Sequence, residues 1–282
     1  MVKILSDSTC DLSRELLEKH DISILPLHIL LGEKEYCDGV DITPDEIFQW
    51  SDAQKTTPKT SAPALDMAME MLEPFVKEKQ PVICFSISED MSTSANVMRM
   101  AASELEAEDL VTVIDSASLS TGIGLLVLHA AEMAQAGKTV EEIQTEIEEL
   151  KPKVRASFVV DTLVYLYRGG RCSGLAAMFG SALHLHPMIV VENGKMHSSK
   201  KYRGKLSKVI LDYAKDLKEQ MEQARSERVF ITHSGCSPEV VEKVQSFLEE
   251  LHIFDEILIT RAGGVISSHC GPGTLGVLFI EK

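Results

Sequence analysis

Chemically reactive side chains stand together near the end of the chain, where His269 and Cys270 precede a Gly-Pro-Gly turn. A cysteine beside a histidine has the composition of a nucleophile and its general base. Adjacent residues on an extended chain point to opposite sides, so this pair is poorly placed to share a hydrogen bond. What remains is a histidine at the end of a loop whose glycines let the backbone approach another group closely.

Hydroxyl side chains recur where apolar runs end and helical patterns begin. They lie in the segments SDST, KTSAP, SISEDMSTS, DSASLSTG and THSGCS. Each hydroxyl alone is explained as a helix cap. In open α/β sheets, however, ligands bind beyond the carboxyl ends of the strands, where the amino ends of helices gather. The repetition of hydroxyl loops therefore indicates a binding site.

Four of these hydroxyls, on Thr60, Ser61, Ser92 and Ser94, are expected at the starts of helices. There they are short neutral donors beside backbone N–H groups and the positive end of a helix dipole, which suits a carboxylate or a phosphate. Lys59 is the only lysine or arginine in the hydroxyl loops. A bound acid would therefore be held by hydrogen bonds rather than by a full counter-charge.

A helix that is apolar nearly all round is predicted over 121–137, which is typical of a buried helix. Its Gly122 and Gly124 remove side chains where its backbone meets a neighbour or a ligand, and Ser116 precedes it; we expect these three to support the site. Methionines at 67, 69, 71, 91, 98, 100 and 178 are either ordinary core residues or the adaptable wall of an apolar pocket. Hydroxyl loops suited to binding a carboxylate, together with apolar surface nearby in the sequence, indicate that the ligand is an amphipathic acid.

Sequence motifs of enzymes and metal sites are largely missing. The segment AGKT at 136–139 imitates a phosphate loop, but Glu132 stands where the first glycine is needed, and no G-x-S-x-G occurs. The strand-end carboxylates match no metal-binding loop; they are Asp7, Asp11, Asp38, Asp41, Asp115 and Asp161. We therefore expect neither a metal nor a cofactor.

The elements that must position these residues alternate as short apolar runs and longer helical patterns, the order typical of βα units. Strands are expected over 2–5, 81–87, 110–115, 155–160, 228–233, 255–261 and 274–282, an extended excursion over 22–37, and a hairpin over 188–203 turning at Asn193-Gly194. Helices are expected over 11–20, 43–50, 65–79, from 94, and over 121–137, 140–151, 174–183, 205–224 and 238–251. Because the pattern restarts after Lys153, we predict two α/β domains with mostly parallel sheets, 1–153 and 154–282.

Composition excludes several classes of protein. The chain has 282 residues, 44% of them hydrophobic and 5% aromatic, which indicates globular domains with aliphatic cores. The formal net charge of -15 disfavours nucleic acids and allows at most transient contact with an anionic membrane. Six scattered cysteines disfavour a disulfide framework or a zinc cluster. No apolar run approaches the ~20 residues that cross a bilayer, and the start lacks the apolar core of a secretion signal, so we expect a cytoplasmic protein.

One segment departs from the acidic composition. From Lys195 to Lys208 there are six basic residues and no acid. This run is interpreted either as a solvated loop or as a docking patch for an anionic partner.

Six fragments resemble segments of the DegV family, in the same order and spacing. They are SDSTCDL, TSAPA, ISEDMSTSANVM, IDSASLSTGIGLLV, LVYLYRGGR and HCGPGTLGV. The resemblance implies two α/β domains that hold a long-chain fatty acid between them, with its acyl chain buried and its carboxyl group near the interface. It also implies the role of some family members, the fatty-acid-binding subunit of a bacterial fatty acid kinase, whose separate ATP-binding subunit phosphorylates the acid.

The resemblance assigns the carboxyl-binding residues. The TS motif of the family falls on Thr60 and Ser61, the serine of its SGT motif on Ser92, and the histidine before GPG on His269. In the family these groups would hold the carboxyl group, which agrees with the interpretation of the hydroxyl loops given above.

Basic residues are assigned to a partner. The YLYRGGR motif places Arg168 and Arg171 near the domain junction, and the KYRGK segment resembles the basic strand of the family. We assign Arg168, Arg171, Lys201, Arg203 and Lys205 to partner docking or phosphate handling.

Two positions depart from the family pattern. Thr93 stands where the SGT motif has glycine, so the backbone there is predicted to turn differently. His186 precedes Pro187 where the family commonly has lysine, which changes the charge offered to a partner.

Three functions are consistent with these features. The first is a non-enzymatic carrier that presents the carboxyl group of a fatty acid to a kinase for acyl-phosphate formation, within phospholipid metabolism and with an acyltransferase as a further candidate partner. The second is a hydrolase or acyltransferase that uses Ser92 or Cys270 with His269. The third is a lipid-sensing regulator, for which the negative charge argues against direct DNA contact. We expect the first.

Overall fold

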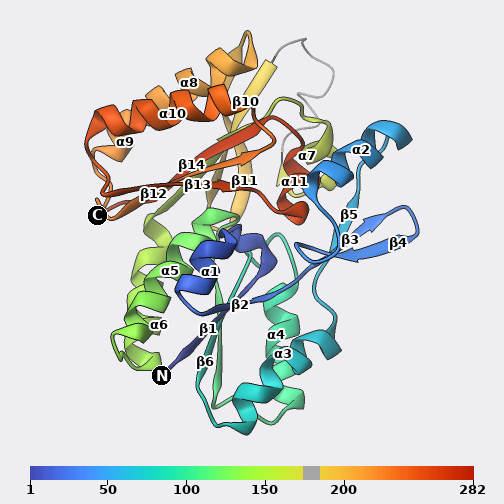
Figure 1. Cartoon of the computed structure of the whole chain (residues 1–282), viewed down its shortest axis with the longest axis vertical. Helices are drawn as coiled ribbons and strands as arrows, with labels where there is room; N and C mark the ends of the chain where they lie inside the picture. The colour runs from blue at the N-terminus through green and yellow to red at the C-terminus, as the bar shows by residue number, and fades with distance from the viewer. Residues whose placement is uncertain (174–184) are drawn as a thin grey trace.

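The computed structural model describes residues 1–173 and 185–282 of the chain. The helix expected over 174–183, and with it Met178, lies outside the described residues. The α/β class is confirmed (Figure 1).

The N-terminal half of the chain forms a parallel sheet of four strands in the order β2-β1-β6-β7. These strands are β1 (Lys3–Asp7), β2 (Ile22–Leu25), β6 (Val82–Ser86) and β7 (Val111–Asp115). A short 3-10 turn, η1 (Ser8–Cys10), follows β1. The helices of this sheet are α1 (Arg14–Lys19), α3 (Leu65–Lys77), α4 (Ser94–Glu104), α5 (Thr121–Gln135) and α6 (Val140–Leu150), each predicted from its apolar pattern.

The predicted extended excursion is a small antiparallel sheet beside the main one. Its strands are β3 (His28–Leu31), β4 (Lys34–Cys37) and β5 (Lys59–Ser61), and α2 (Pro44–Gln54) connects β4 to β5. The expectation that Thr60 and Ser61 start a helix is wrong, because both pair with β3 as part of β5 and α3 begins only at Leu65.

The C-terminal half forms a sheet in the order β13-β12-β14-β8-β10-β11-β9. Its strands are β8 (Val154–Val159), β9 (Cys172–Ser173), β10 (Leu185–Glu192), β11 (Lys195–Arg203), β12 (Arg228–Ser234), β13 (Glu256–Arg261) and β14 (Thr274–Ile280). Mostly parallel pairing, predicted for both sheets, does not hold here, where four of the six pairings between described strands are antiparallel. The reason is local: the tight turn at Asn193-Gly194 makes β10 and β11 antiparallel neighbours, and β14 runs between β8 and β12 against both.

The helices of this half differ more from the prediction. They are α7 (Val164–Gly169), α8 (Leu206–Asp216), α9 (Lys218–Met221), α10 (Pro238–Leu251) and α11 (Gly264–Cys270), with the 3-10 turn η2 (Lys151–Lys153) leading into β8. The helix expected over 205–224 is divided into α8 and α9. The loop expected around His269 is instead the last turn of α11, which, like α7, is too short to show a helical period in the sequence.

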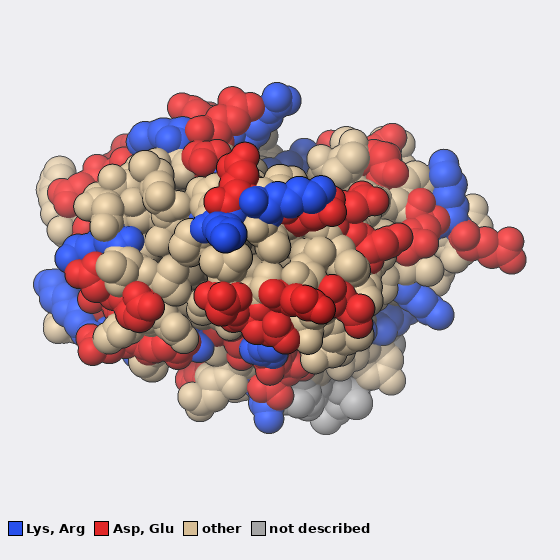
Figure 2. Space-filling model, turned by 90° about the horizontal axis from the view of Figure 1, so that it is seen from below, with Lys and Arg blue, Asp and Glu red and all other residues tan. Residues whose placement is uncertain are grey.

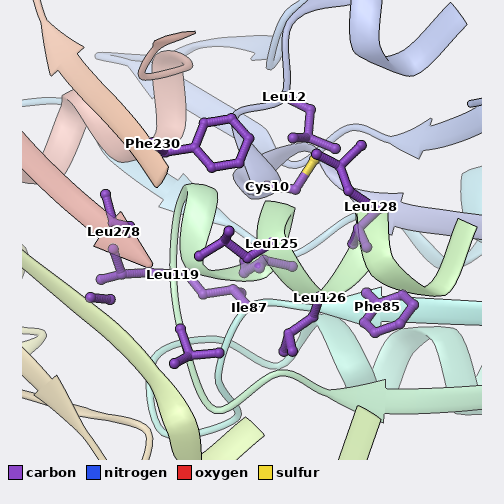
Figure 3. Close-up of a cluster of buried hydrophobic side chains, with 14 of the residues drawn as sticks. Cys10, Leu12, Phe85, Ile87, Leu119, Leu125, Leu126, Leu128, Phe230 and Leu278 are labelled. Atoms are coloured by element: carbon purple, nitrogen blue, oxygen red, sulfur yellow. The ribbon is translucent and has the colours of Figure 1, made fainter. Parts of the chain in front are cut away.

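Sheets and helices alternate as layers (Figure 1). Helices α3 and α4 pack on one face of the parallel sheet, α5 lies between the two sheets with α6 packed against it, and α8 and α10 cover the far face of the large sheet. Figure 3 shows α5 at the centre, with Leu125 between Phe230 and Leu278 of the large sheet and Cys10 of the N-terminal half. The predicted boundary at residue 153 stays a proposal; the large sheet is built from strands that begin at Val154.

The surface carries the acidic charge of the sequence. Figure 2 shows Asp and Glu side chains spread over the face seen from below, with Lys and Arg side chains scattered among them. None of the helices in the described ranges is long and apolar enough to cross a bilayer. Within the same ranges, no three His, Cys, Asp or Glu side chains are arranged to hold a metal ion.

Candidate functional site

A cavity of about 440 Å³ lies between the two halves of the molecule, within the range of about 300–1,000 Å³ typical of small-molecule sites. Strand β5 and the loops after β6 and β7 form one side, and β8, β12, β14 and α11 form the other. This position beyond the ends of parallel strands is the one that the hydroxyl loops predict. Its apolar wall consists of Leu27, Ile87, Met91, Leu119, Phe158, Leu166, Met196, Val265, Ile266 and Leu278.

The four residues proposed to hold a carboxyl group, Thr60, Ser61, Ser92 and His269, all line this cavity. We call them the head-group site. Thr60 Oγ1 lies 2.7 Å from His269 Nε2, although 209 positions separate the two residues in sequence. Strand β5 therefore brings a hydroxyl of the N-terminal half against an imidazole carried by α11.

The His269 side chain is half-buried, but its Nδ1 atom is buried and has no hydrogen-bond partner among the described residues. Burial, with Arg171 nearby, lowers the pKa of His269 to about 4. The ring is therefore neutral near pH 7 and carries one N–H. Placing that hydrogen on Nε2 satisfies it with Thr60 Oγ1, since a buried N–H without an acceptor is rarely tolerated. The hydroxyl hydrogen of Thr60 then remains available for a ligand.

Ser92 has a similar arrangement at the start of α4. Its Oγ lies 2.9 Å from Ser94 Oγ and also accepts a hydrogen bond from the Ser94 backbone N–H. When the Ser94 hydroxyl donates, the hydrogen of Ser92 is free to turn into the cavity. Ser61 has no hydrogen-bond partner for its hydroxyl within the described part of the chain, so the head-group site offers hydroxyl donors that the protein itself does not use.

The charges at the cavity are unevenly compensated. Glu89 and Asp90 line it, but Glu89 pairs with Arg99 at 2.6 Å and Asp90 lies 3.5 Å from Lys195. Arg171 also lines it and donates to the carbonyl oxygen of Gly169 at 2.7 Å. Of the Lys and Arg side chains in the described ranges, Arg171 is the only one in the lining, and it has no carboxylate partner there. The cavity thus keeps one guanidinium for an anionic ligand.

Other hydroxyls in the cavity come mainly from strands of the large sheet. We call Ser157, Ser234 and Thr274 the sheet wall. Thr274 donates to the Cys270 carbonyl oxygen. Thr232 also lines the cavity, with its Oγ1 2.6 Å from Thr121 Oγ1 and 3.0 Å from Thr260 Oγ1, and either hydroxyl of each pair can be the donor.

The hydrogens of Ser157 and Ser234 are committed by their partners. Tyr213 donates its hydroxyl hydrogen to the Ser157 carbonyl oxygen, so the Ser157 hydroxyl must donate to Tyr213. Ser267 donates to the Ala262 carbonyl oxygen, so the Ser234 hydroxyl must donate to Ser267. The sheet wall therefore offers a ligand no free donor.

Helix α11 is held in place by aspartate carboxyl groups of the N-terminal half. Asp11 accepts a hydrogen bond from the Gly263 backbone N–H at 2.8 Å, and Asp38 accepts one from Gly264 at 2.7 Å. The other oxygen of Asp11 accepts from Ser120, which lines the cavity. Burial raises the pKa of both carboxyls, that of Asp11 to about 8. Two carboxyls near the start of the chain thus fix the helix that carries His269.

The remaining predicted residues lie elsewhere. Ser94, Ser116, Gly122 and Gly124 are not among the described residues that line the cavity. A Cβ on Gly122 would lie 2.2 Å from Ser118 Oγ, and one on Gly124 would lie 2.8 Å from Leu12 Cδ2. The two glycines therefore let α5 pack closely against its neighbours.

The basic residues assigned to a partner occupy the surface. Arg168 lies on α7, while Lys201, Arg203 and Lys205 lie at or just after the end of β11, and all four are exposed. The methionines mostly pack in the core beside the parallel sheet, and of those named from the sequence only Met91 is among the described lining residues.

Sequence reasoning missed several lining residues. Met196, Phe158 and Leu278 contribute apolar surface from the large sheet, and alternation along their strands is the signal that could have indicated them. Asp11 and Asp38 were noted only as carboxylates without a metal-binding spacing, because contacts over 252 and 226 positions leave no local pattern.

The geometry does not assemble a nucleophile and a base from Ser92 or Cys270. Among the described residues, Ser92 Oγ bonds to Ser94 and His269 Nε2 to Thr60, with no hydrogen bond joining Ser92 or Cys270 to the imidazole. Burial raises the pKa of Cys270 to about 12, which keeps it a thiol. The cavity therefore presents donors to an acid rather than an activated nucleophile.

Comparisons with known proteins agree with this geometry. The model of a family described as "Uncharacterised protein, DegV family" matches residues 1–282. A DegV domain-containing protein of Clostridium perfringens is 31% identical over 283 residues, covering 100% of this chain and 99% of the relative. A fatty-acid-binding DegV family protein of Thermus thermophilus is 29% identical with a TM-score of 0.90, and a stearic acid-binding protein of Eubacterium ventriosum is 32% identical with a TM-score of 0.88. Each structure match covers 100% of this chain and 99% of the other.

Proposed function

The chain belongs to the DegV family, and from this premise and the geometry of the cavity we propose that it binds a long-chain fatty acid. The head-group site would hold the carboxyl group through Thr60, Ser61, Ser92 and His269. The acyl chain would lie along the apolar wall between the two halves of the molecule.

The observation that supports this assignment most strongly is the difference between the two sets of cavity hydroxyls. Thr60 and Ser92 each have a neighbour that can donate to them, so their own hydrogens are available. Hydrogen bonds to a carboxylate contribute about 1.5–3 kcal/mol each. A fatty acid would therefore lie with its carboxylate toward Thr60 and His269, where Arg171, which has no carboxylate partner among the described residues, adds a positive charge.

The remainder of the cavity favours an aliphatic chain. Burial of each methylene contributes about 0.8 kcal/mol, and the side chains of Leu119, Phe158 and Leu278 supply contacts for it. An empty apolar cavity would forfeit both the burial and the packing contacts.

Lipid extraction tests the proposal directly. Protein purified without added lipid is extracted with organic solvent, and the extract is analysed by mass spectrometry. We expect a fatty acid in near one-to-one stoichiometry with the protein. A lipid-free preparation that also takes up no added fatty acid would contradict the proposal.

We further propose that the protein presents the bound carboxyl group to a separate ATP-dependent kinase, in the cytoplasm. The family resemblance implies this partner, and the exposed cations Arg168, Lys201, Arg203 and Lys205 supply a basic surface on an acidic molecule. Such a surface would steer an anionic partner and would be weakened by salt. The acyl phosphate would then enter phospholipid metabolism, with an acyltransferase as a second partner.

Charge-reversal variants distinguish presentation of the carboxyl group to a kinase from binding of the fatty acid. The Lys201→Glu, Arg203→Glu, Lys205→Glu variant should retain bound fatty acid while losing acyl-phosphate formation with a fatty acid kinase ATP-binding subunit. The matched control reverses Lys19, Lys79 and Lys243, which are exposed elsewhere. Unchanged phosphorylation in the first triple variant would show that these three cations lie on a solvated surface without a partner.

A further inference from the structure

Helix α7 ends in two consecutive glycines, Gly169 and Gly170, and each position requires glycine for a different reason. Gly170 has a φ of +69°, in the left-handed region that favours glycine, and a Cβ there would meet nothing within 4 Å. Gly169 is not among the glycines of positive φ, so its backbone conformation does not require glycine. The requirement at Gly169 is space.

The imidazole of His269 occupies the place that a side chain at position 169 would need. A Cβ on Gly169 would lie 2.4 Å from His269 Nδ1 and 3.2 Å from Cε1. Contacts this short do not occur between real atoms, so one of the groups would have to move. The backbone of α7 is held by its own helix, whereas the ring is held by a single hydrogen bond to Thr60. The ring is therefore the group that would move.

Gly169 also binds Arg171, the one Lys or Arg side chain among the described residues that line the cavity. Its carbonyl oxygen accepts the hydrogen bond from Arg171 Nη1 at 2.7 Å. The absence of a side chain on Gly169 thus leaves room for the imidazole of His269, and its backbone carbonyl binds the guanidinium of Arg171.

Building on the fatty-acid-binding function proposed above, we propose that Gly169 is a positioning residue for the head-group site. Its lack of a side chain seats the His269 ring so that Nε2 reaches Thr60, and its carbonyl holds Arg171 at the cavity. It acts on a bound carboxyl group only through these two side chains.

A double-mutant cycle tests this inference. Gly169→Ala should weaken fatty acid binding about tenfold, as His269→Ala does, because in each the Thr60 hydroxyl loses the imidazole N–H that leaves its own hydrogen directed at the carboxylate. In the His269→Ala background the added methyl occupies the space left by the ring, so the double variant should bind within about twofold of His269→Ala. Alanine is the better helix former, so a loss of affinity on Gly169→Ala is not an effect of helix propensity.

The imidazole itself provides a readout that does not depend on lipid. Long-range 1H–15N spectra of the wild type, with His269 assigned by its absence in His269→Ala, report the tautomer and surroundings of the ring. Gly169→Ala should shift these signals. Gly170→Asn is the matched control, because asparagine tolerates the left-handed conformation, and it should leave them unchanged.

The outcomes are distinct. If the single variant fails to fold and the double variant folds with the affinity of His269→Ala, the inference is also supported. Effects that multiply to about a hundredfold in the double variant, imidazole signals unchanged by Gly169→Ala, or a double variant that does not fold would overturn it. A wild type that binds no fatty acid would contradict the proposed function, while the spectra would still decide the role of Gly169.

Discussion

The head-group site and the sheet wall face the same cavity and are built from the same chemical group, yet they offer a ligand different things. Thr60 and Ser92 lie beside groups that can donate to them, and their own hydrogens can turn toward a ligand. Ser234 and Thr274 give their hydrogens to other groups of the protein, the Ser267 hydroxyl and the Cys270 carbonyl oxygen. The polarity of a cavity is therefore decided by where its hydroxyl hydrogens go, and not by how many hydroxyls line it.

The largest expected effect comes from changing the ligand. A fatty alcohol of the same length should bind at least about a hundredfold more weakly than the acid, because it loses two or more hydrogen bonds to a charged group. Titration calorimetry with the two ligands measures the difference. Equal affinities would mean that the head-group site does not hold the carboxylate.

A matched pair of substitutions comes next. Thr60→Val should weaken binding about tenfold, whereas Thr274→Val should leave affinity within about twofold. Thr274→Val should instead lower the free energy of unfolding by about 1–3 kcal/mol, because the Cys270 carbonyl oxygen loses its donor. Ligand binding and urea denaturation measured on both variants give the comparison. A tenfold loss of affinity in Thr274→Val would show that the sheet wall does contact the head group.

The acyl chain length of the ligand tests the contribution of the apolar wall of the cavity. Each added methylene should strengthen binding about fourfold until the cavity is filled, after which affinity should level off. Competition against a fluorescent fatty acid over a series of saturated acids measures the slope. A slope that does not depend on Thr60→Val would show that head and tail contribute independently, and a flat series would argue against burial of the tail.

The smallest effect concerns pH. The pKa of His269 is lowered to about 4 by burial, so this ring stays neutral between pH 6 and pH 8. Asp11, with a pKa raised to about 8, titrates in that window, so the expected constant is the ratio of the wild-type and His269→Ala affinities, which should change less than about twofold. Stability behaves differently below that window. From pH 6.5 down to 4 the unfolded chain binds a proton that the folded protein does not, so stability should fall by up to about 3 kcal/mol. Denaturation curves of the wild type and His269→Ala should converge toward pH 4.

The sequence allowed the fold class to be predicted, and it indicated the four residues that the structure brings to one cavity, for different reasons. The helix over 121–137 has an apolar pattern that is independent of its surroundings, and α5 is found there. Thr60, Ser92 and His269 were indicated by family motifs, although two of their local structures were predicted wrongly. Thr60 lies in a strand because β3 supplies its hydrogen bonds, and no local pattern shows that pairing.

Other features depend on contacts that no single segment contains. The roles of Asp11 and Asp38 depend on the backbone N–H groups of Gly263 and Gly264, which follow more than 220 positions later. The saturation of the sheet wall depends on Tyr213 and Ser267, whose hydroxyls meet it only in the folded molecule. Antiparallel pairing of β14 likewise depends on its insertion between β8 and β12.

The anchoring of α11 has a consequence for the protein during its synthesis. Asp11 leaves the ribosome 252 residues before its partner Gly263, a delay of roughly 10–50 s at bacterial rates of elongation. Through that interval the parallel sheet can fold, but the helix that completes the cavity has not yet been made. If the cavity holds a fatty acid as proposed, a nascent or prematurely terminated chain therefore lacks the helix that completes the binding site, and only finished molecules would compete for the ligand.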